Sequence, residues 1–147
     1  MLVAQSMPLT DELDMLVPSR KPGAPEQQAQ VAVVAYLREA LPPGSIVAAV
    51  KNEHRARSRS RGSQIRFHQK RKATGVKAGF PDLICLIPGG KTVLIEMKAP
   101  KRGRLSPAQI ECHAALRSLG HVVGVARSID EAQLVLQQAG VPLRART

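Results

Sequence analysis

The central part of the chain contains few acidic residues, and their positions suggest a catalytic site. Between Glu53 and Glu111 the only acids are Asp82 and Glu96, against fourteen Lys or Arg residues. Both lie in or beside apolar segments with the pattern of β-strands, where a buried carboxylate is unfavourable unless it is paired or binds a cation. We expect no His or Cys near these two carboxylates. They would then form an oxygen-ligand site, which suits Mg²⁺ or Mn²⁺.

Lys98 follows Glu96 by two residues, so the two side chains share one face of the predicted strand. The opposite face carries the apolar side chains of Val93, Ile95 and Met97. Asp82 begins the preceding strand and can converge on Glu96 and Lys98 across a turn at 88–91. A lysine beside a bound metal can orient a water and stabilise charge on a phosphate, as phosphodiester hydrolysis requires. Taken alone, however, a Glu-x-Lys pair on a strand is usually a silent surface ion pair.

Four motifs follow one another along the chain: GFPD at 79–82, EMK at 96–98, GRLSPAQ at 103–109 and LGHVV at 119–123. In this order they resemble the PD-(D/E)xK nuclease superfamily. The closest resemblance within it is to the VRR-NUC domain, in its small stand-alone form from phages and bacteria. The resemblance spans about residues 25–140.

This resemblance implies an α/β fold of the restriction-endonuclease type, with a mixed β-sheet flanked by helices, and an enzyme that cleaves DNA, commonly at branched structures. It implies that Asp82 and Glu96 bind the divalent metal, with the Met97 carbonyl as a further ligand. Lys98 would position the attacking water.

The resemblance adds two more residues to the expected site. Gln109 corresponds to an additional active-site residue of the family, although a Gln near a helix start is ordinarily a solvated polar residue. The first helix of the family carries a glutamate that reaches the metal. Glu26 is the candidate here, with Val33 and Leu37 on its side of the helix facing the sheet. A Glu in a first helical turn is also favoured simply by the helix dipole.

The charge balance favours a polyanionic partner, since the net charge is +11 and the pI is about 10.7. Residues 51–77 contain ten Lys or Arg and one acid, and like charges at this density predict a mobile loop or a long exposed β-hairpin. Because Phe67 is the only aromatic residue there, we expect recognition of DNA backbone or shape rather than base stacking. A solvated charge run is the alternative. The expected DNA-binding residues are Arg55, Arg57, Arg59, Arg61, Arg66, Lys70, Arg71, Lys72, Lys101, Arg102 and Arg104.

The remaining pattern predicts one domain over 25–142, preceded by a flexible arm over 1–24 that is rich in proline. A helix is predicted to begin at Pro25 and to end before Pro42-Pro43-Gly44. The other predicted elements are strands at 45–50, 82–87, 92–98 and 121–126, a helix from Ser106 to Gly120, and a helix from Ser128 to Gly140. The run Ser128-Ile129-Asp130-Glu131 matches a capping box.

Composition narrows the class of protein. Hydrophobic residues make up 44% and aromatic residues 2%, so we expect an aliphatic core. Cys85 and Cys112 lack metal-site spacing and are predicted to be buried thiols. No apolar run approaches the roughly 20 residues that span a bilayer, and the N-terminus lacks a signal-peptide pattern. We therefore expect an intracellular, cytoplasmic protein.

The sequence thus predicts a divalent-metal-dependent, structure-selective DNA endonuclease that acts on Holliday junctions or other branches, with a homodimer as the expected assembly. The alternative is a non-catalytic basic module that binds DNA or RNA. An enzyme acting on a small phosphate compound is disfavoured because no GxxxxGK[ST] loop is present.

Overall fold

The structure is a computed structural model that describes residues 24–50, 61–101 and 103–144. The predicted N-terminal arm up to residue 23 and the first ten residues of the basic segment lie outside them. The elements are α1 (Pro25–Ala40), β1 (Ile46–Ala49), α2 (Arg61–Ala73), β2 (Leu83–Ile87), β3 (Lys91–Met97), α3 (Pro107–Ser118), β4 (Val122–Ala126) and α4 (Ile129–Gln138).

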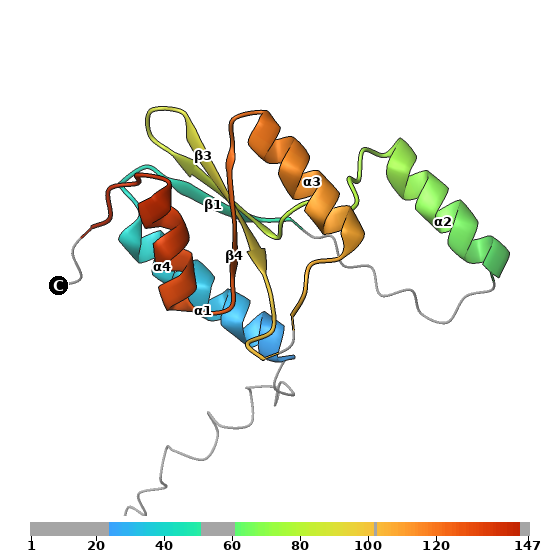
Figure 1. Cartoon of the computed structure of the whole chain (residues 1–147), viewed down its shortest axis with the longest axis horizontal. Helices are drawn as coiled ribbons and strands as arrows, with labels where there is room; N and C mark the ends of the chain where they lie inside the picture. The colour runs from blue at the N-terminus through green and yellow to red at the C-terminus, as the bar shows by residue number, and fades with distance from the viewer. Residues whose placement is uncertain (1–23, 51–60, 102, 145–147) are drawn as a thin grey trace, which may run out of the picture.

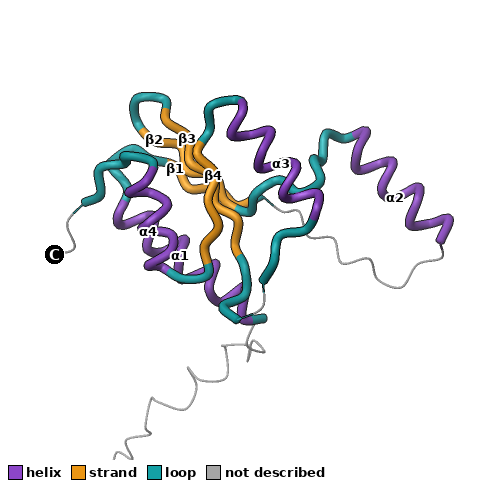
Figure 2. The backbone as a smooth tube through the Cα atoms, viewed as in Figure 1, coloured by secondary structure: helices purple, strands orange, loops and turns teal. Residues whose placement is uncertain are grey.

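The four strands form one mixed sheet in the order β1-β2-β3-β4 (Figure 2). β2 pairs with β1 and with β3 in antiparallel fashion, so β2 and β3 make the predicted hairpin. β4 pairs with β3 in parallel, with Glu96 opposite Val125. α3 provides the crossover between these two parallel strands, as the geometry of parallel pairing requires. The predicted mixed sheet flanked by helices is confirmed.

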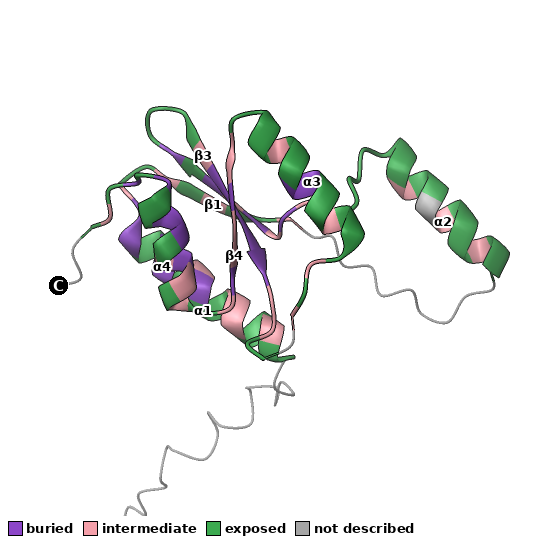
Figure 3. Cartoon of the chain, viewed as in Figure 1, coloured by how far each residue is buried: buried purple, intermediate pink, exposed green. Residues whose placement is uncertain are grey.

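The main core lies between the sheet and the helices α1 and α4, which contact each other and the strands (Figures 1 and 3). Val33 and Leu37 of α1 are fully buried there, as expected. Val93, Ile95 and Met97 of β3 face the same core, while the intervening side chains face the side of the sheet that α3 covers. Among the described residues the core is aliphatic apart from Tyr36 and the sulfur-containing side chains of Cys85 and Met97.

α2 corrects the prediction of a loop or hairpin over 51–77, because residues 61–73 form a helix. The helix ends in a Schellman motif: Gly75, with φ +83°, donates its N–H to Lys72 O, and the N–H of Val76 is donated to Arg71 O. Basic residues in the last turn also suit the negative end of the helix dipole. Helix-forming Gln, Lys and Arg thus outweigh the repulsion between like charges.

The starts of α3 and α4 differ from the expected capping. In α4, the Ser128 hydroxyl accepts a hydrogen bond from the N–H of Glu131, but the Glu131 carboxylate accepts from the N–H of Arg127 rather than from that of Ser128. The complete capping box occurs at α3, between Ser106 and Gln109. This difference matters because Gln109 also belongs to the candidate site.

Cys85 and Cys112 are free and buried, as predicted. Within the described ranges, no helix combines the length and apolar character needed to cross a lipid bilayer.

Candidate active site

The predicted trio of Asp82, Glu96 and Lys98 comes together where β2 begins and β3 ends. Asp82 is fixed through its backbone, whose carbonyl accepts a 2.7 Å hydrogen bond from the N–H of Val50. Its Oδ2 accepts a 2.9 Å hydrogen bond from the N–H of Met97, which ties the two strand ends together. Lys98 Nζ lies 2.9 Å from Glu96 Oε1. The neighbouring strands therefore hold the two carboxylates and the lysine in one small region.

Gln109, in the first turn of α3, joins this group. Its Oε1 accepts hydrogen bonds from Lys98 Nζ at 3.0 Å and from the N–H of Ser106 at 2.9 Å. Its Nε2 donates to Glu96 Oε1. Its own N–H is donated to Ser106 Oγ at 3.3 Å, completing the capping box. One residue therefore caps the helix and connects the Lys98 and Glu96 side chains.

Two glycines of the motifs allow the close approaches that build the site. Gly79 has φ +75° and packs against the backbone of Ala108 at the start of α3. A Cβ at Gly103 would stand 2.5 Å from Lys98 Cβ, so the loop before α3 can pass over the lysine stem only with glycine there. Arg127 holds the same loop by donating from its guanidinium to Gly103 O at 3.0 Å.

Glu96 is almost completely buried, with 1% of its surface exposed. Burial is the main cause that raises its pKa from 4.5 to about 7. The hydrogen bond and the charge of Lys98 act in the opposite direction, while the carboxylates of Asp82 and Glu26 raise the pKa further. Its Oε2 is buried without a hydrogen-bond partner among the described residues. A carboxylate in this state is stabilised by an added cation.

His113 is a residue of the site that the sequence interpretation missed, and it corrects the expectation of no His near the carboxylates. It lies one turn after Gln109 on α3, is fully buried, and places Nε2 3.8 Å from Glu96 Oε2. Burial, followed by the positive charges of Arg117 and Lys98, lowers its pKa and so favours the neutral ring. The four-residue spacing from Gln109 could have identified it, because such positions share a helix face.

For the other two predicted metal ligands, Glu26 and Met97, the structure gives weaker support. Glu26 lies in the first turn of α1, close enough to Glu96 to raise its pKa. Across the described chain, no three His, Cys, Asp or Glu side chains are grouped as a metal cage, so Glu26 does not complete one. Met97 buries its side chain in the core and uses its N–H to hold Asp82.

The donor set nevertheless fits a hard divalent cation. Asp82 and Glu96 offer carboxylate oxygens, and the buried Glu96 Oε2 lacks a partner in this part of the chain. Mg²⁺ in proteins is commonly bound through one or two carboxylates and retains several waters, so a full protein cage is unnecessary.

The predicted DNA-binding residues fall into three groups. Arg61, Arg66, Lys70, Arg71 and Lys72 lie on α2. Lys101 and Arg104 are exposed in the loop before α3. Arg55, Arg57, Arg59 and Arg102 lie outside the described residues.

Fold and site together define an α/β domain in which two carboxylates, a lysine and a glutamine converge at one end of a mixed sheet. The profile of the VRR-NUC domain family matches residues 24–130. The chain belongs to this family.

Individual relatives agree with this assignment. "Putative nuclease p44" of Acyrthosiphon pisum secondary endosymbiont phage 1 is 41% identical over 54 residues, which are 37% of this chain and 57% of that protein. The match thus covers little more than half the length of this relative. A solved structure described as a VRR_NUC domain protein is 26% identical with a TM-score of 0.52, covering 83% of this chain and 93% of that one. Another, described as a VRR_NUC domain, is 20% identical with a TM-score of 0.50 and covers 78% and 97%. The latter supports the fold alone.

Proposed function

We propose that this protein is a divalent-metal-dependent endodeoxyribonuclease. The observation that carries the proposal is the contact of Lys98 Nζ with both Glu96 Oε1 and Gln109 Oε1, beside the aspartate that is tied to the same strand. Membership of the VRR-NUC family and the likeness to a phage protein named as a nuclease support it.

Asp82 and Glu96 are the proposed metal ligands, with the Met97 carbonyl and Glu26 as further ones. The ion, Mg²⁺ or Mn²⁺, would act as a Lewis acid towards the scissile phosphate and a water. Binding it requires Glu96 to be ionised, which Lys98 favours.

Lys98 is the proposed residue that positions the attacking water. Its ammonium carries three donors, and the carboxylate of Glu96 and the amide of Gln109 occupy two acceptor directions around it. One donor direction then remains for a water or a phosphate oxygen, and the side chain is 12% exposed. Gln109 fixes the ammonium, because its amide is itself held by the N–H of Ser106.

The proposed substrate is DNA, held through its phosphates by the exposed basic residues of α2 and of the loop before α3. Each phosphate neutralised releases counterions, so binding should weaken as salt rises. Branched DNA, Holliday junctions included, is the finer part of the proposal. A two-fold homodimer would present one site to each of two strands. Native mass spectrometry with and without a four-way junction tests this assembly.

The decisive experiment measures cleavage of supercoiled plasmid, linear duplex and a four-way junction, with Mg²⁺, Mn²⁺ or EDTA. We expect metal-dependent cleavage, reduced about 100-fold or more in Lys98→Ala and Asp82→Asn. Lys77→Ala removes the same charge from an exposed position and should leave the rate within about twofold, as expected for a surface substitution.

The alternative function is a non-catalytic module that binds DNA or RNA. Metal-independent binding without cleavage of any of these substrates would establish that alternative and reject the nuclease.

A further inference from the structure

α2 is the most basic element of the described chain and stands apart from the rest of the domain. Its sequence, RGSQIRFHQKRKA, contains five Lys or Arg and no acid. It makes no contact with another described helix or strand, and its N-terminal end is the part of the helix furthest from the sheet (Figure 1). The helix therefore does not contribute to the core that the other described elements form.

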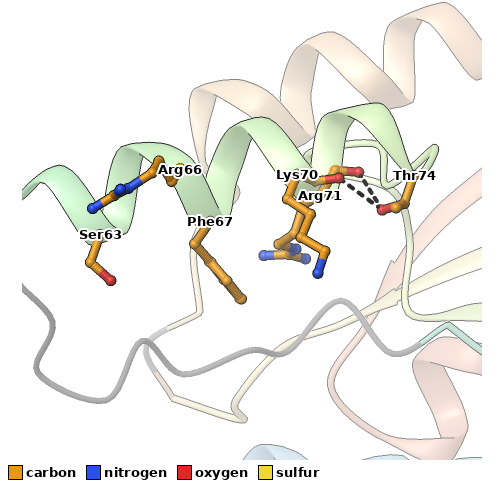
Figure 4. A pocket seen from close by; sticks show the side chains of 6 residues that line it. All are labelled: Ser63, Arg66, Phe67, Lys70, Arg71 and Thr74. Carbon is orange, nitrogen blue, oxygen red and sulfur yellow. Dashed lines mark hydrogen bonds between the residues drawn. The ribbon is translucent and has the colours of Figure 1, made fainter.

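One face of α2 combines cations with an aromatic ring. The residues of this face, which we call the α2 stripe, recur every three or four positions and line one hollow. They are Ser63, Arg66, Phe67, Lys70, Arg71 and Thr74 (Figure 4). Phe67, Lys70 and Arg71 point to the same side of the helix, and the guanidinium carbon of Arg71 lies 5.8 Å from the centre of the Phe67 ring. Ile65 and Lys72 lie on the opposite side by helical periodicity.

We propose that the α2 stripe binds a single-stranded segment of DNA next to the duplex that is cleaved. The inference rests on the proposed nuclease function and specifies its substrate as a duplex that adjoins unpaired nucleotides.

A single aromatic residue in the basic segment favours backbone recognition over stacking, but the helix places Phe67 among cations on one face. This arrangement revises that expectation and fits an unpaired strand better than a duplex. Arg66, Lys70 and Arg71 can neutralise phosphates of either. Phe67 at their centre gains little from a duplex, whose bases are stacked on one another and offer only their edges. An unpaired base offers its face, and an aromatic ring flanked by cations is the usual platform for single strands. Because all bases have such a face, no strong sequence preference is expected.

The stripe is connected closely to the candidate active site. α2 ends at Ala73, nine residues before Asp82. A chain of that length spans at most about 30 Å. Phe67 lies six helical residues before Ala73, which adds about 9 Å. At 3.4 Å per base pair the total is about twelve base pairs, so the unpaired segment lies within little more than one helical turn of the cleaved phosphate.

Fluorescence anisotropy in EDTA, with labelled DNA of one sequence as a single strand and as a blunt duplex, tests the proposal without cleavage. Phe67→Leu should weaken single-strand binding about tenfold and duplex binding less than twofold, because stacking on one base is lost. Phe67→Tyr, which keeps the ring, should bind like wild type. Ile65→Ala removes an exposed apolar side chain from the opposite side and should change neither affinity by more than twofold.

A second pair of variants distinguishes binding at the α2 stripe from a general effect of positive charge. Lys70→Gln and Lys72→Gln remove the same charge two residues apart. We expect the larger loss of single-strand affinity, and the larger decrease in its salt dependence, in Lys70→Gln. Equal losses in the two variants, or equal effects of Phe67→Leu on single strand and duplex, would overturn the proposal. Tighter binding of single-stranded RNA than of DNA would also overturn it.

These outcomes are separable from those of the nuclease test. Cleavage by wild type together with unchanged binding by Phe67→Leu rejects the α2 stripe alone. Absence of cleavage together with a selective loss of single-strand binding rejects the nuclease and leaves the α2 stripe as a single-strand binding site without a cleaved duplex beside it.

Discussion

Gly79 packs so closely against Ala108 that a Cβ at position 79 would stand 2.2 Å from the Ala108 carbonyl oxygen. Gly79 precedes the Pro81-Asp82 pair, and Ala108 precedes Gln109. The contact therefore connects the segment that carries the candidate metal ligand to the helix that carries the glutamine.

Gly79→Ala should destabilise the protein by about 3 kcal/mol, because it adds both a steric clash and a side chain at positive φ. Gly75→Ala is the matched control, since Gly75 has φ +83° but open space around its Cβ position. It should cost only about 1 kcal/mol. Urea unfolding measures both values. Equal losses of unfolding free energy in the two variants would show that the close approach to Ala108 does not affect stability.

Ser106→Ala and Gln109→Ala should separate capping from catalysis. Each removes part of the capping box, so each should lower the unfolding free energy by about 1 kcal/mol. Gln109→Ala also removes the contacts with Lys98 and Glu96 and should reduce DNA cleavage by at least about tenfold. Ser106→Ala should retain most activity. A comparable loss of activity in both would mean that helix capping alone supports the site.

The stability of the metal-free protein should fall as the pH rises from about 4.5 to 7. The pKa of Glu96 is raised to about 7 in the folded state, so over this interval the folded protein keeps a proton that the unfolded chain has released. The contribution of Glu96 to the free energy of unfolding is of the order of 3 kcal/mol. It is complete at low pH and is lost above pH 7.

Chemical unfolding from pH 4.5 to 8.5, in EDTA, measures this change. In Glu96→Gln, the part of the pH dependence of the unfolding free energy that is due to Glu96 should disappear. The contributions of the other acids should remain in both proteins. Mn²⁺ at pH 8 should stabilise wild type and not the variant. A wild-type profile that matches the variant would reject the raised pKa.

His113→Met should leave the unfolding free energy unchanged or raise it by about 1 kcal/mol. Both ring nitrogens of His113 are buried without a hydrogen-bond partner in the described part of the chain, so an apolar side chain of similar size removes an unfavourable burial. Thermal unfolding in EDTA provides the measurement. A loss greater than about 2 kcal/mol would show that the imidazole has a partner that stabilises the fold.

Most of the sheet and three of the helices were predictable because their signals are local. Alternating apolar residues mark β3, and glycines mark the ends of α3 and α4 at Gly120 and Gly140. α2 ends with the same hydrogen-bond pattern at Gly75, whereas the charge density of 51–77 predicts a mobile loop or a long exposed β-hairpin. The like charges obscure this helix in the sequence, because their repulsion opposes the helix propensity of Lys, Arg and Gln.

The site was predictable where it is formed by neighbours in sequence and missed where it depends on packing between elements. The alternation of β3 placed Glu96 and Lys98 on one face, and the hairpin brought Asp82 to them. For His113 the local signal is weak: its four-residue spacing from Gln109 puts both on one face of α3, but does not show that this face is buried. Burial of the imidazole depends on the way α3 lies on the sheet.

Gln109 both caps α3 and contacts Lys98 and Glu96, and this has a consequence for the order in which the site forms during folding. Its amide can connect Lys98 to Glu96 only after its own N–H and that of Ser106 have closed the first turn of α3. Chains that are unfinished or partly folded, with this turn still open, lack the complete arrangement. In the nuclease proposed above, a newly synthesised molecule should therefore complete its active site only once the first turn of α3 has formed on the sheet.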